Sequence, residues 1–188
     1  MPGMTHDRAA DWPRFHGTTI LAVRGKERVV MAGDGQVTLN HTVIKHNARK
    51  VRRIYKDTIL AGFAGATADA MTLTEKLEQK LERYNGNLAR SAVELARDWR
   101  ADKYLRRLEA LMIAVDRTSM LLISGSGDVI EPDEGIVAIG SGGVAAQAAA
   151  TALCQHTELD PRQVVEVSMK IAASLCVFTN DRITIEEL

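Results

Sequence analysis

The sequence predicts an α+β fold in which two antiparallel sheets pack face to face and each is covered by a pair of helices. Strands come in runs of two or three and helices in consecutive pairs, in the order ββ, ββ, αα, ββ(β), αα, β. Helix pairs do not fit the single crossover helices of a parallel sheet. The length of 188 residues is typical of one domain that is large enough for several layers.

The first part of the chain predicts two hairpins. Their strands are short segments rich in apolar and β-branched residues, at residues 19–23, 28–32, 49–55 and 58–64. The turns fall at residues 25–27 and at Lys56-Asp57. The polar stretch 36–47 between the hairpins reads as a loop with a short apolar segment.

The middle of the chain predicts a helix pair. The first helix opens at residues 65–69 and carries Leu73, Leu77 and Leu81 on one stripe. Asn85-Gly86-Asn87 ends it, and a second amphipathic helix runs from Leu88 to about Leu105.

The last part repeats the pattern with strands followed by helices. Strands are expected at residues 111–115, 120–124 and 136–139, with a final strand at 182–185. One helix is expected from Val144 to about His156. Another runs to about Ala173 after Asp160-Pro161, a typical N-cap and first-turn pair.

Composition limits the classes of function. Lys plus Arg and Asp plus Glu are both 24, and this zero net charge suggests neither a nucleic-acid nor a membrane partner. The charged first residues do not form a secretory signal, and no apolar run is long enough to span a bilayer. Cys154 and Cys176 have no metal or redox spacing, so we expect a reduced, cytoplasmic protein.

Thr18 is the candidate nucleophile. It follows Gly17 and opens the first strand, after a leader of residues 1–17 that shows no apolar periodicity. A cut after Gly17 would place a hydroxyl and a free α-amine on one residue, and this amine has an ordinary pKa of about 7.7–8. A threonine hydroxyl needs such a neighbouring base to attack a carbonyl. The alternative is a β-branched residue that simply starts a strand.

Asp34 and Lys50 are candidate partners. Asp34 lies in Gly33-Asp34-Gly35 at the end of an apolar strand, where an ordinary turn aspartate is the alternative. Lys50 belongs to the basic run 49–53, which otherwise reads as a solvated strand face. Strand alternation would put Lys50 with Arg52 and Ile54 on one face. An ammonium beside an α-amine would lower the pKa of that amine.

Two glycine-containing segments could provide further groups. Backbone N–H groups around Gly62, in residues 62–65, could form an oxyanion hole. Ser141 lies in Gly140-Ser141-Gly142-Gly143 at a strand–helix junction that is typical of phosphate loops. This segment lacks the Lys-Ser/Thr pair of a P-loop and the glycine spacing of a dinucleotide site, so nucleotide binding is disfavoured.

Taken together, these segments resemble one family, the bacterial proteasome-like threonine peptidases called HslV or ClpQ. Examples are Thr18-Thr19-Ile20 and Ala32-Gly33-Asp34-Gly35-Gln36. The other similar stretches are residues 49–53, 60–65, 67–70, 93–96, 98–100, 105–110, 138–143 and 185–188. The resemblance runs colinearly from Thr18 to Leu188.

The resemblance implies an N-terminal-nucleophile hydrolase fold, an αββα sandwich like that of a proteasome β-subunit. It implies Thr18 as nucleophile with Lys50 and Asp34 beside it, Ser141 near its amine, and Gly62 as oxyanion donor. It also implies a homo-oligomer of two stacked hexameric rings that degrades unfolded polypeptides delivered by an HslU-type AAA+ ATPase. No organic cofactor is implied.

The resemblance further implies a sodium ion held by residues equivalent to Ala173, Cys176 and Thr179. The family usually has glycine at the position of Ala173, a change that matters little if the ligand is a backbone carbonyl.

The leader is a departure from the family pattern, in which methionine often directly precedes the threonine. Activity would therefore require removal of residues 1–17, which leaves residues 18–188 as a single peptidase domain. Two alternatives are a non-catalytic ring subunit in which Thr18 is never freed, and a small-molecule amidohydrolase of the same nucleophile class.

Overall fold

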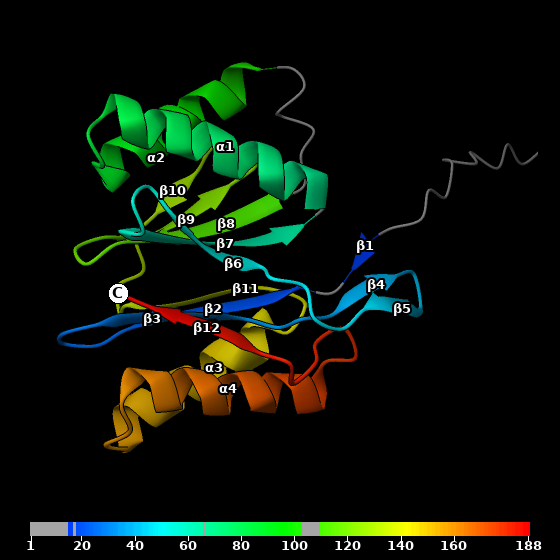
Figure 1. Ribbon diagram of the computed structural model, residues 1–188. Coiled ribbons are helices and arrows are strands. Elements are labelled where there is room, and N and C mark those ends of the chain that lie inside the picture. Colours follow the sequence, from blue (N-terminus) through cyan, green and yellow to red (C-terminus); the bar gives the residue numbers. More distant parts are fainter. Residues whose placement is uncertain (1–14, 17, 66, 103–109) are drawn as a thin grey trace, which may run out of the picture.

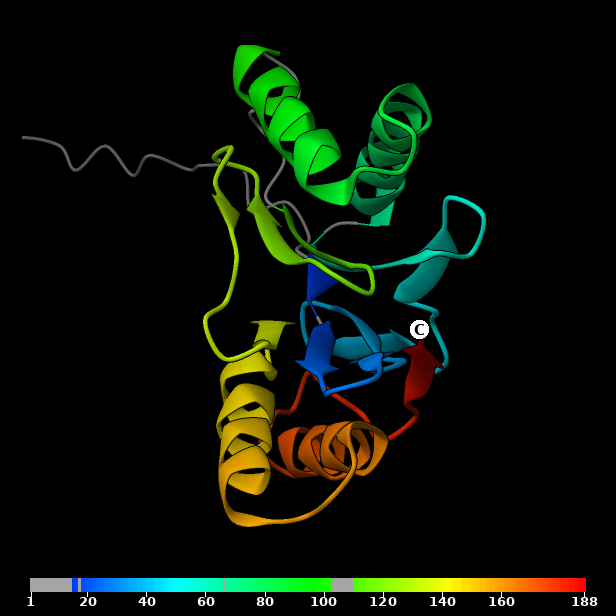
Figure 2. The same ribbon diagram turned by 90° about the vertical axis from the view of Figure 1, so that its left-hand side faces the viewer.

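Four layers are stacked in the order helix pair, sheet, sheet, helix pair (Figure 1). The computed structural model describes residues 15–16, 18–65, 67–102 and 110–188. Figure 2, turned by 90°, shows both helix pairs on the outer faces of the sheets. The predicted αββα sandwich is therefore confirmed.

Both large sheets are antiparallel throughout. The five-stranded sheet has the order β10 (Val129–Ile130), β9 (Met120–Ser124), β8 (Ala110–Val115), β7 (Ile59–Gly65) and β6 (Val51–Ile54). The four-stranded sheet has the order β11 (Ile136–Gly140), β2 (Thr19–Arg24), β3 (Val29–Gly33) and β12 (Thr184–Glu187).

The helices cover the sheets in consecutive pairs. Helices α1 (Thr67–Arg83) and α2 (Leu88–Ala101) pack on the five-stranded sheet, and α3 (Gly143–His156) and α4 (Pro161–Leu175) pack on the four-stranded sheet. The predicted cap of α4 is present, because Asp160 and Gln163 form a reciprocal capping box. The second helix is shorter than predicted: it ends at Ala101 and not near Leu105, because its C-cap Asp102 has an extended backbone.

The apolar alternation of β2 sorts its side chains between two cores rather than between core and solvent. Ile20 and Ala22 join the cluster between the two sheets, whereas Leu21 and Val23 join the cluster under α3 and α4. A strand that lies between a second sheet and a helix layer is buried on both faces. Its first five residues are accordingly all buried.

The stretch expected to be a loop between the two hairpins contains a small hairpin, β4 (Val37–Leu39) and β5 (Thr42–Lys45). All four residues of β5 are exposed, so burial imposed no apolar pattern that could have revealed the strand. The leader residues of β1 (Phe15–His16) pair antiparallel with β4 and extend this hairpin to three strands. The final strand begins at Thr184, two residues later than predicted.

No helix among the described residues is long and apolar enough to cross a membrane.

Leu73, Leu77 and Leu81 of α1 should contribute strongly to the stability of the core between the five-stranded sheet and helices α1 and α2. Leu77 is completely buried there, so Leu77→Ala should lower the free energy of unfolding by about 2–5 kcal/mol through lost burial and a residual cavity. Met71 lies on the same helix with 47% exposure, and Met71→Ala should change it by about 0.5 kcal/mol or less. Denaturant titration measures both, and equal losses would contradict the assigned packing.

Candidate active site

Thr18 is held at the start of β2 by the turn that follows β11. Its carbonyl oxygen accepts a hydrogen bond from the backbone N–H of Ser141 at 2.8 Å. Gly140 has φ of +92°, and a Cβ there would lie 1.8 Å from the Thr18 oxygen. Only glycine fits this approach, so the turn after β11 fixes the backbone of Thr18.

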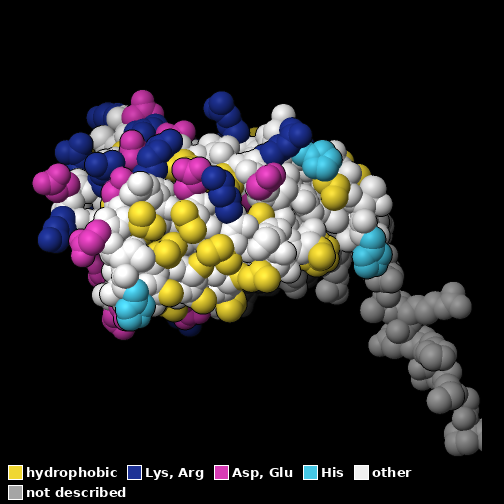
Figure 3. All heavy atoms as spheres, turned by 90° about the horizontal axis from the view of Figure 1, so that it is seen from below, with side chains coloured by type: hydrophobic (Ala, Val, Ile, Leu, Met, Phe, Trp, Pro, Cys, Tyr) yellow, Lys and Arg dark blue, Asp and Glu magenta, His cyan; other side chains and the backbone are white. Residues whose placement is uncertain are grey.

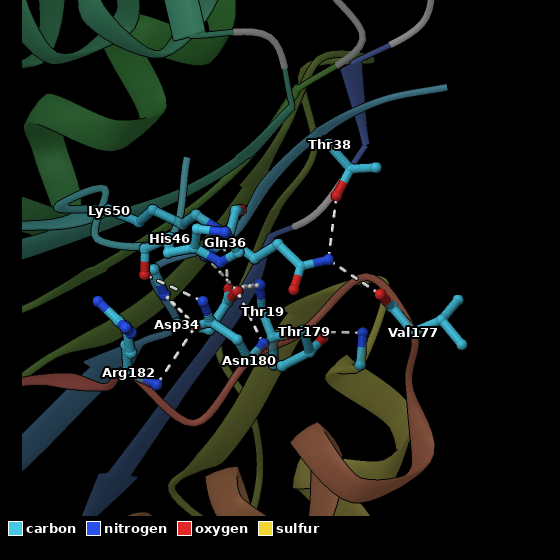
Figure 4. Close-up of polar contacts among 12 residues, drawn as sticks. Thr19, Asp34, Gln36, Thr38, His46, Lys50, Val177, Thr179, Asn180 and Arg182 are labelled. Carbon is cyan, nitrogen blue, oxygen red and sulfur yellow. Dashed lines mark hydrogen bonds and ion pairs between the residues drawn. The ribbon is translucent and has the colours of Figure 1, made fainter. Parts of the chain in front are cut away.

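Thr19 anchors the chain directly after Thr18. It is completely buried, and its N–H donates to Asp34 Oδ1 at 2.7 Å (Figure 4). Its hydroxyl lies 2.7 Å from the Thr179 hydroxyl and accepts the N–H of Gly142 at 2.9 Å. These contacts fix both the backbone N–H and the hydroxyl of Thr19, and so they position Thr18, which is bonded to it.

A buried ion pair lies beside this strand start. Lys50 Nζ donates to Asp34 Oδ1 at 2.7 Å, and the side chains are only 8% and 0% exposed. The ammonium also donates to the Gln36 carbonyl oxygen at 2.6 Å. Burial lowers the pKa of Lys50, and the charge and hydrogen bond of Asp34 oppose that shift.

The second oxygen of Asp34 is also satisfied. Asp34 Oδ2 accepts the N–H of Gln36 at 2.9 Å and that of Asn180 at 3.4 Å. A buried carboxylate needs hydrogen-bond donors in place of water, and here backbone N–H groups and an ammonium supply them.

Of the basic residues in the run 49–53, Lys50 is the one that contacts Asp34. The prediction that Lys50, Arg52 and Ile54 share a face is wrong, because Lys50 precedes β6 and is not governed by its alternation. Ile54 packs in the core beneath α1 and α2, and Arg52 is exposed. Lys50 instead reaches across to Asp34, which follows β3 in the other sheet.

Ser141 and Gly62 are placed differently from each other. Ser141 contacts Thr18 through its backbone N–H, as described above. Gly62 lies inside β7, paired with Val51 on one side and Ile113 on the other. The backbone groups of a strand paired on both sides belong to the ladder, so this geometry does not favour Gly62 as an oxyanion donor.

The expected cation ligands lie at the end of α4. Ala173 is in the last turn of the helix, Cys176 is its C-cap, and the Cys176 carbonyl accepts the N–H of Thr179 at 3.0 Å. The last carbonyls of a helix lack helical partners and carry its negative dipole end. Backbone oxygens here therefore fit a hard monovalent cation. The described residues contain no cluster of three His, Cys, Asp or Glu side chains suited to a metal.

Sequence reasoning assigned no role to Thr19, Gln36 or Asn180. Asn180 contacts Asp34 from 146 positions away and also accepts the N–H of Gly35 at 3.0 Å. No local spacing could link residues so distant. The only signal was the polar pair Thr179-Asn180 between an apolar helix and the last strand.

A threonine at a strand start, beside a buried lysine–aspartate pair in an αββα sandwich, defines the class of N-terminal-nucleophile hydrolases. The family model of the proteasome subunit matches residues 14–188. The chain is 60% identical to the ATP-dependent protease subunit HslV of Syntrophobacter fumaroxidans, over 92% of this chain and 97% of that protein.

Two further comparisons agree. HslV of Aquifex aeolicus is 60% identical over 171 residues, which cover 91% of this chain and 97% of that protein. A crystal structure of eukaryotic HslV from Trypanosoma brucei has a TM-score of 0.87 and 48% identity, covering 90% of this chain and 98% of that chain. The chain therefore belongs to the proteasome subunit family, in its HslV group.

The buried pair should behave as one unit. Lys50→Met leaves the Asp34 charge buried without its cation, so the free energy of unfolding should fall by about 3–5 kcal/mol. Asp34→Asn should cost a similar amount, and the double variant should cost less than the sum of the two. Denaturant titrations of all four proteins give the coupling energy, and simple additivity would contradict the ion pair.

Stability should also depend on alkaline pH through Lys50. The lowered pKa means that the unfolded chain binds this proton more tightly than the folded protein does. The contribution of Lys50 to the free energy of unfolding should therefore increase as pH rises from the lowered pKa toward the ordinary 10.5. The stability difference between wild type and Lys50→Met, measured against pH, should grow in that direction, and a decrease would refute the assigned burial.

Proposed function

We propose that this chain is the proteolytic core subunit of an ATP-dependent protease, a threonine endopeptidase whose nucleophile is Thr18. The observation that supports this most is the placement of Thr18 beside the buried Lys50–Asp34 pair, at the start of β2. The similarity to proteins named ATP-dependent protease subunit HslV supports the same assignment.

The freed α-amine of Thr18 acts as the base. It takes the hydroxyl proton directly or through a water molecule, and Oγ then attacks the substrate carbonyl. The Lys50 ammonium favours the neutral amine near pH 7, because a nearby positive charge lowers the pKa of an amine. The proton passes to the leaving amine, and water then hydrolyses the acyl-enzyme.

The oxyanion donor is better sought at the end of β7 than at Gly62. Gly65 is exposed there with φ of +140°. Its neighbour Ala64 lies next to Gly140, which in turn contacts the Thr18 carbonyl. Gly65 pairs with Ala110 of β8, whereas the pairing with β6 ends at Gly62, so this end of β7 is paired on one side. A backbone N–H on its open side would stabilise a developing negative charge.

Residues 1–17 act as a leader that is removed by a cut after Gly17, so that residues 18–188 form the mature peptidase domain. The Thr18 hydroxyl attacks the Gly17 carbonyl, and the amide C–N bond then breaks, which moves the leader onto Oγ as an ester and frees the α-amine. Water hydrolyses this ester, which releases the leader as a carboxylate and restores the Thr18 hydroxyl. Loss of the leader also removes β1, which pairs with β4 through Phe15–Leu39 and His16–Thr38. The uncovered edge of β4 then accepts an extended substrate strand.

Assembly into two stacked hexameric rings would enclose these sites. In support, the outer face of α3 and α4 carries exposed apolar side chains, visible in Figure 3. They include Val144 at 85% and Leu175 at 70% exposure, with Val167 and Ile171 between them in sequence. Apolar patches on a soluble subunit mark contact sites. An HslU-type ATPase would supply unfolded polypeptides in the cytoplasm, with no nucleic acid or membrane involved.

A sodium ion fits the carbonyl oxygens of Ala173, Cys176 and Thr179 at the end of α4. When bound it would supply positive charge that steadies this segment. An alanine in place of the usual glycine does not remove a carbonyl ligand, so the fit does not depend on that side chain.

Replacement of the nucleophile tests the proposal. Thr18→Ala should lose all peptide hydrolysis while retaining the fold and the assembly state, because the substitution removes the reacting hydroxyl and leaves the backbone contacts of residue 18 unchanged. The intact mass of wild type should correspond to residues 18–188, whereas Thr18→Ala should keep its leader.

Thr18→Ser is the matched control, because it retains both hydroxyl and amine and should keep part of the activity. A wild-type chain that hydrolyses peptides with its whole leader attached would contradict the free-amine mechanism. Hydrolysis by Thr18→Ala would exclude Thr18 as nucleophile.

A further inference from the structure

Gln36 is a buried polar residue at this site to which the mechanism above gives no role. Its side chain is enclosed, with the whole residue 6% exposed. The amide Nε2 donates to Thr38 Oγ1 at 3.0 Å and to the Val177 carbonyl oxygen at 2.9 Å (Figure 4). The side chain thus connects the loop after β3 to the segment after α4.

The backbone of the same residue contacts both members of the ion pair. Its N–H donates to Asp34 Oδ2 at 2.9 Å, and its carbonyl oxygen accepts from Lys50 Nζ at 2.6 Å. Gln36 therefore joins the Lys50 ammonium to the segment after α4, alongside the second link that Asn180 makes through Asp34.

The side chain is needed to orient that carbonyl. Residue 35 is glycine, and its close approach to the backbone of His46 leaves no room for a Cβ, which would lie 2.3 Å from the His46 oxygen. Gly35 is itself held, because its N–H donates to Asn180 Oδ1 at 3.0 Å and its carbonyl oxygen accepts the N–H of Ala48 at 2.9 Å. The Gln36 carbonyl belongs to the next peptide unit, so its direction depends also on the contacts that Gln36 itself makes. The contact of Gln36 with a residue far away in the sequence is the hydrogen bond from its amide to the Val177 carbonyl oxygen.

We propose that Gln36 is a positioning residue. Its side-chain amide donates to the Val177 carbonyl oxygen, and this contact holds the backbone carbonyl of Gln36 where it accepts the hydrogen bond of the Lys50 ammonium. This proposal rests on the proposed function, because the ammonium matters through its effect on the Thr18 amine. If the anchor is lost, the ammonium is held less firmly near the amine, and the pKa of the amine rises.

The test uses Gln36→Met, expressed as the whole chain and allowed to remove its own leader, since methionine has a similar length but no donor. We expect kcat to fall about three- to tenfold, as for loss of one hydrogen bond, with KM little changed. The acid limb of the kcat/KM profile should move to higher pH, because that limb reports the free enzyme's base. An unchanged kcat and pH profile, with only a lower melting temperature, would overturn the proposal and leave a structural role.

Two further variants sharpen the result. Thr38→Val removes the other acceptor of the Gln36 amide but keeps Val177, so its effect should be smaller; an equal effect would overturn Val177 as the anchor. If Gln36→Met does not fold, Gln36→Glu serves instead, because a carboxylate has no donor for Val177, and an unchanged profile again overturns the proposal. Thr18→Ala in the same assay separates the two failures, since only its activity would disprove the proposed function.

Discussion

The structure depends on one buried carboxylate, that of Asp34. Four donors converge on it, from Thr19, Lys50, Gln36 and Asn180. They come from the start of β2, the residue before β6, the loop after β3 and the segment after α4. A buried charge is expensive to hold unless it is paired and fully hydrogen-bonded, and here all of these segments must be in place to achieve that.

This constraint explains why the sandwich is needed for the chemistry. Asp34 follows a strand of one sheet and Lys50 precedes a strand of the other, so the pair forms only when the sheets pack face to face. Glycines allow this packing to be close. A Cβ at Gly62 would lie 2.7 Å from Ile20, and one at Gly33 would lie 2.9 Å from the same side chain.

The sequence predicted those parts of the fold that leave a local pattern. The Leu73, Leu77 and Leu81 stripe and the Asp160-Pro161 cap predicted their helices, because periodicity and capping act within a few residues. The β4–β5 hairpin was missed because exposed strands carry no such pattern. The site was predicted less completely. Asp34 and Lys50 were weak candidates individually and were strengthened by family resemblance.

The remaining site residues depend on long-range packing that no spacing encodes. Thr19 reads as an ordinary strand residue, yet its N–H and hydroxyl connect Asp34, Gly142 and Thr179. Asn180 and Val177 reach the site only because α4 ends beside it. The direction of the Lys50 side chain could not be predicted from the sequence either, because strand alternation applies only inside a strand and Lys50 precedes β6.

The central claim is that the hydroxyl and the α-amine of Thr18 act together beside the Lys50–Asp34 pair. A peptide epoxyketone, whose two electrophilic carbons can bond to one hydroxyl and one amine, tests this directly. Mass-spectrometric mapping of the inactivated wild-type protein should find the adduct on chains that begin at Thr18, joined through both Oγ and the α-amine. An adduct on another residue, or no adduct in a protein that still hydrolyses peptides, would contradict the account.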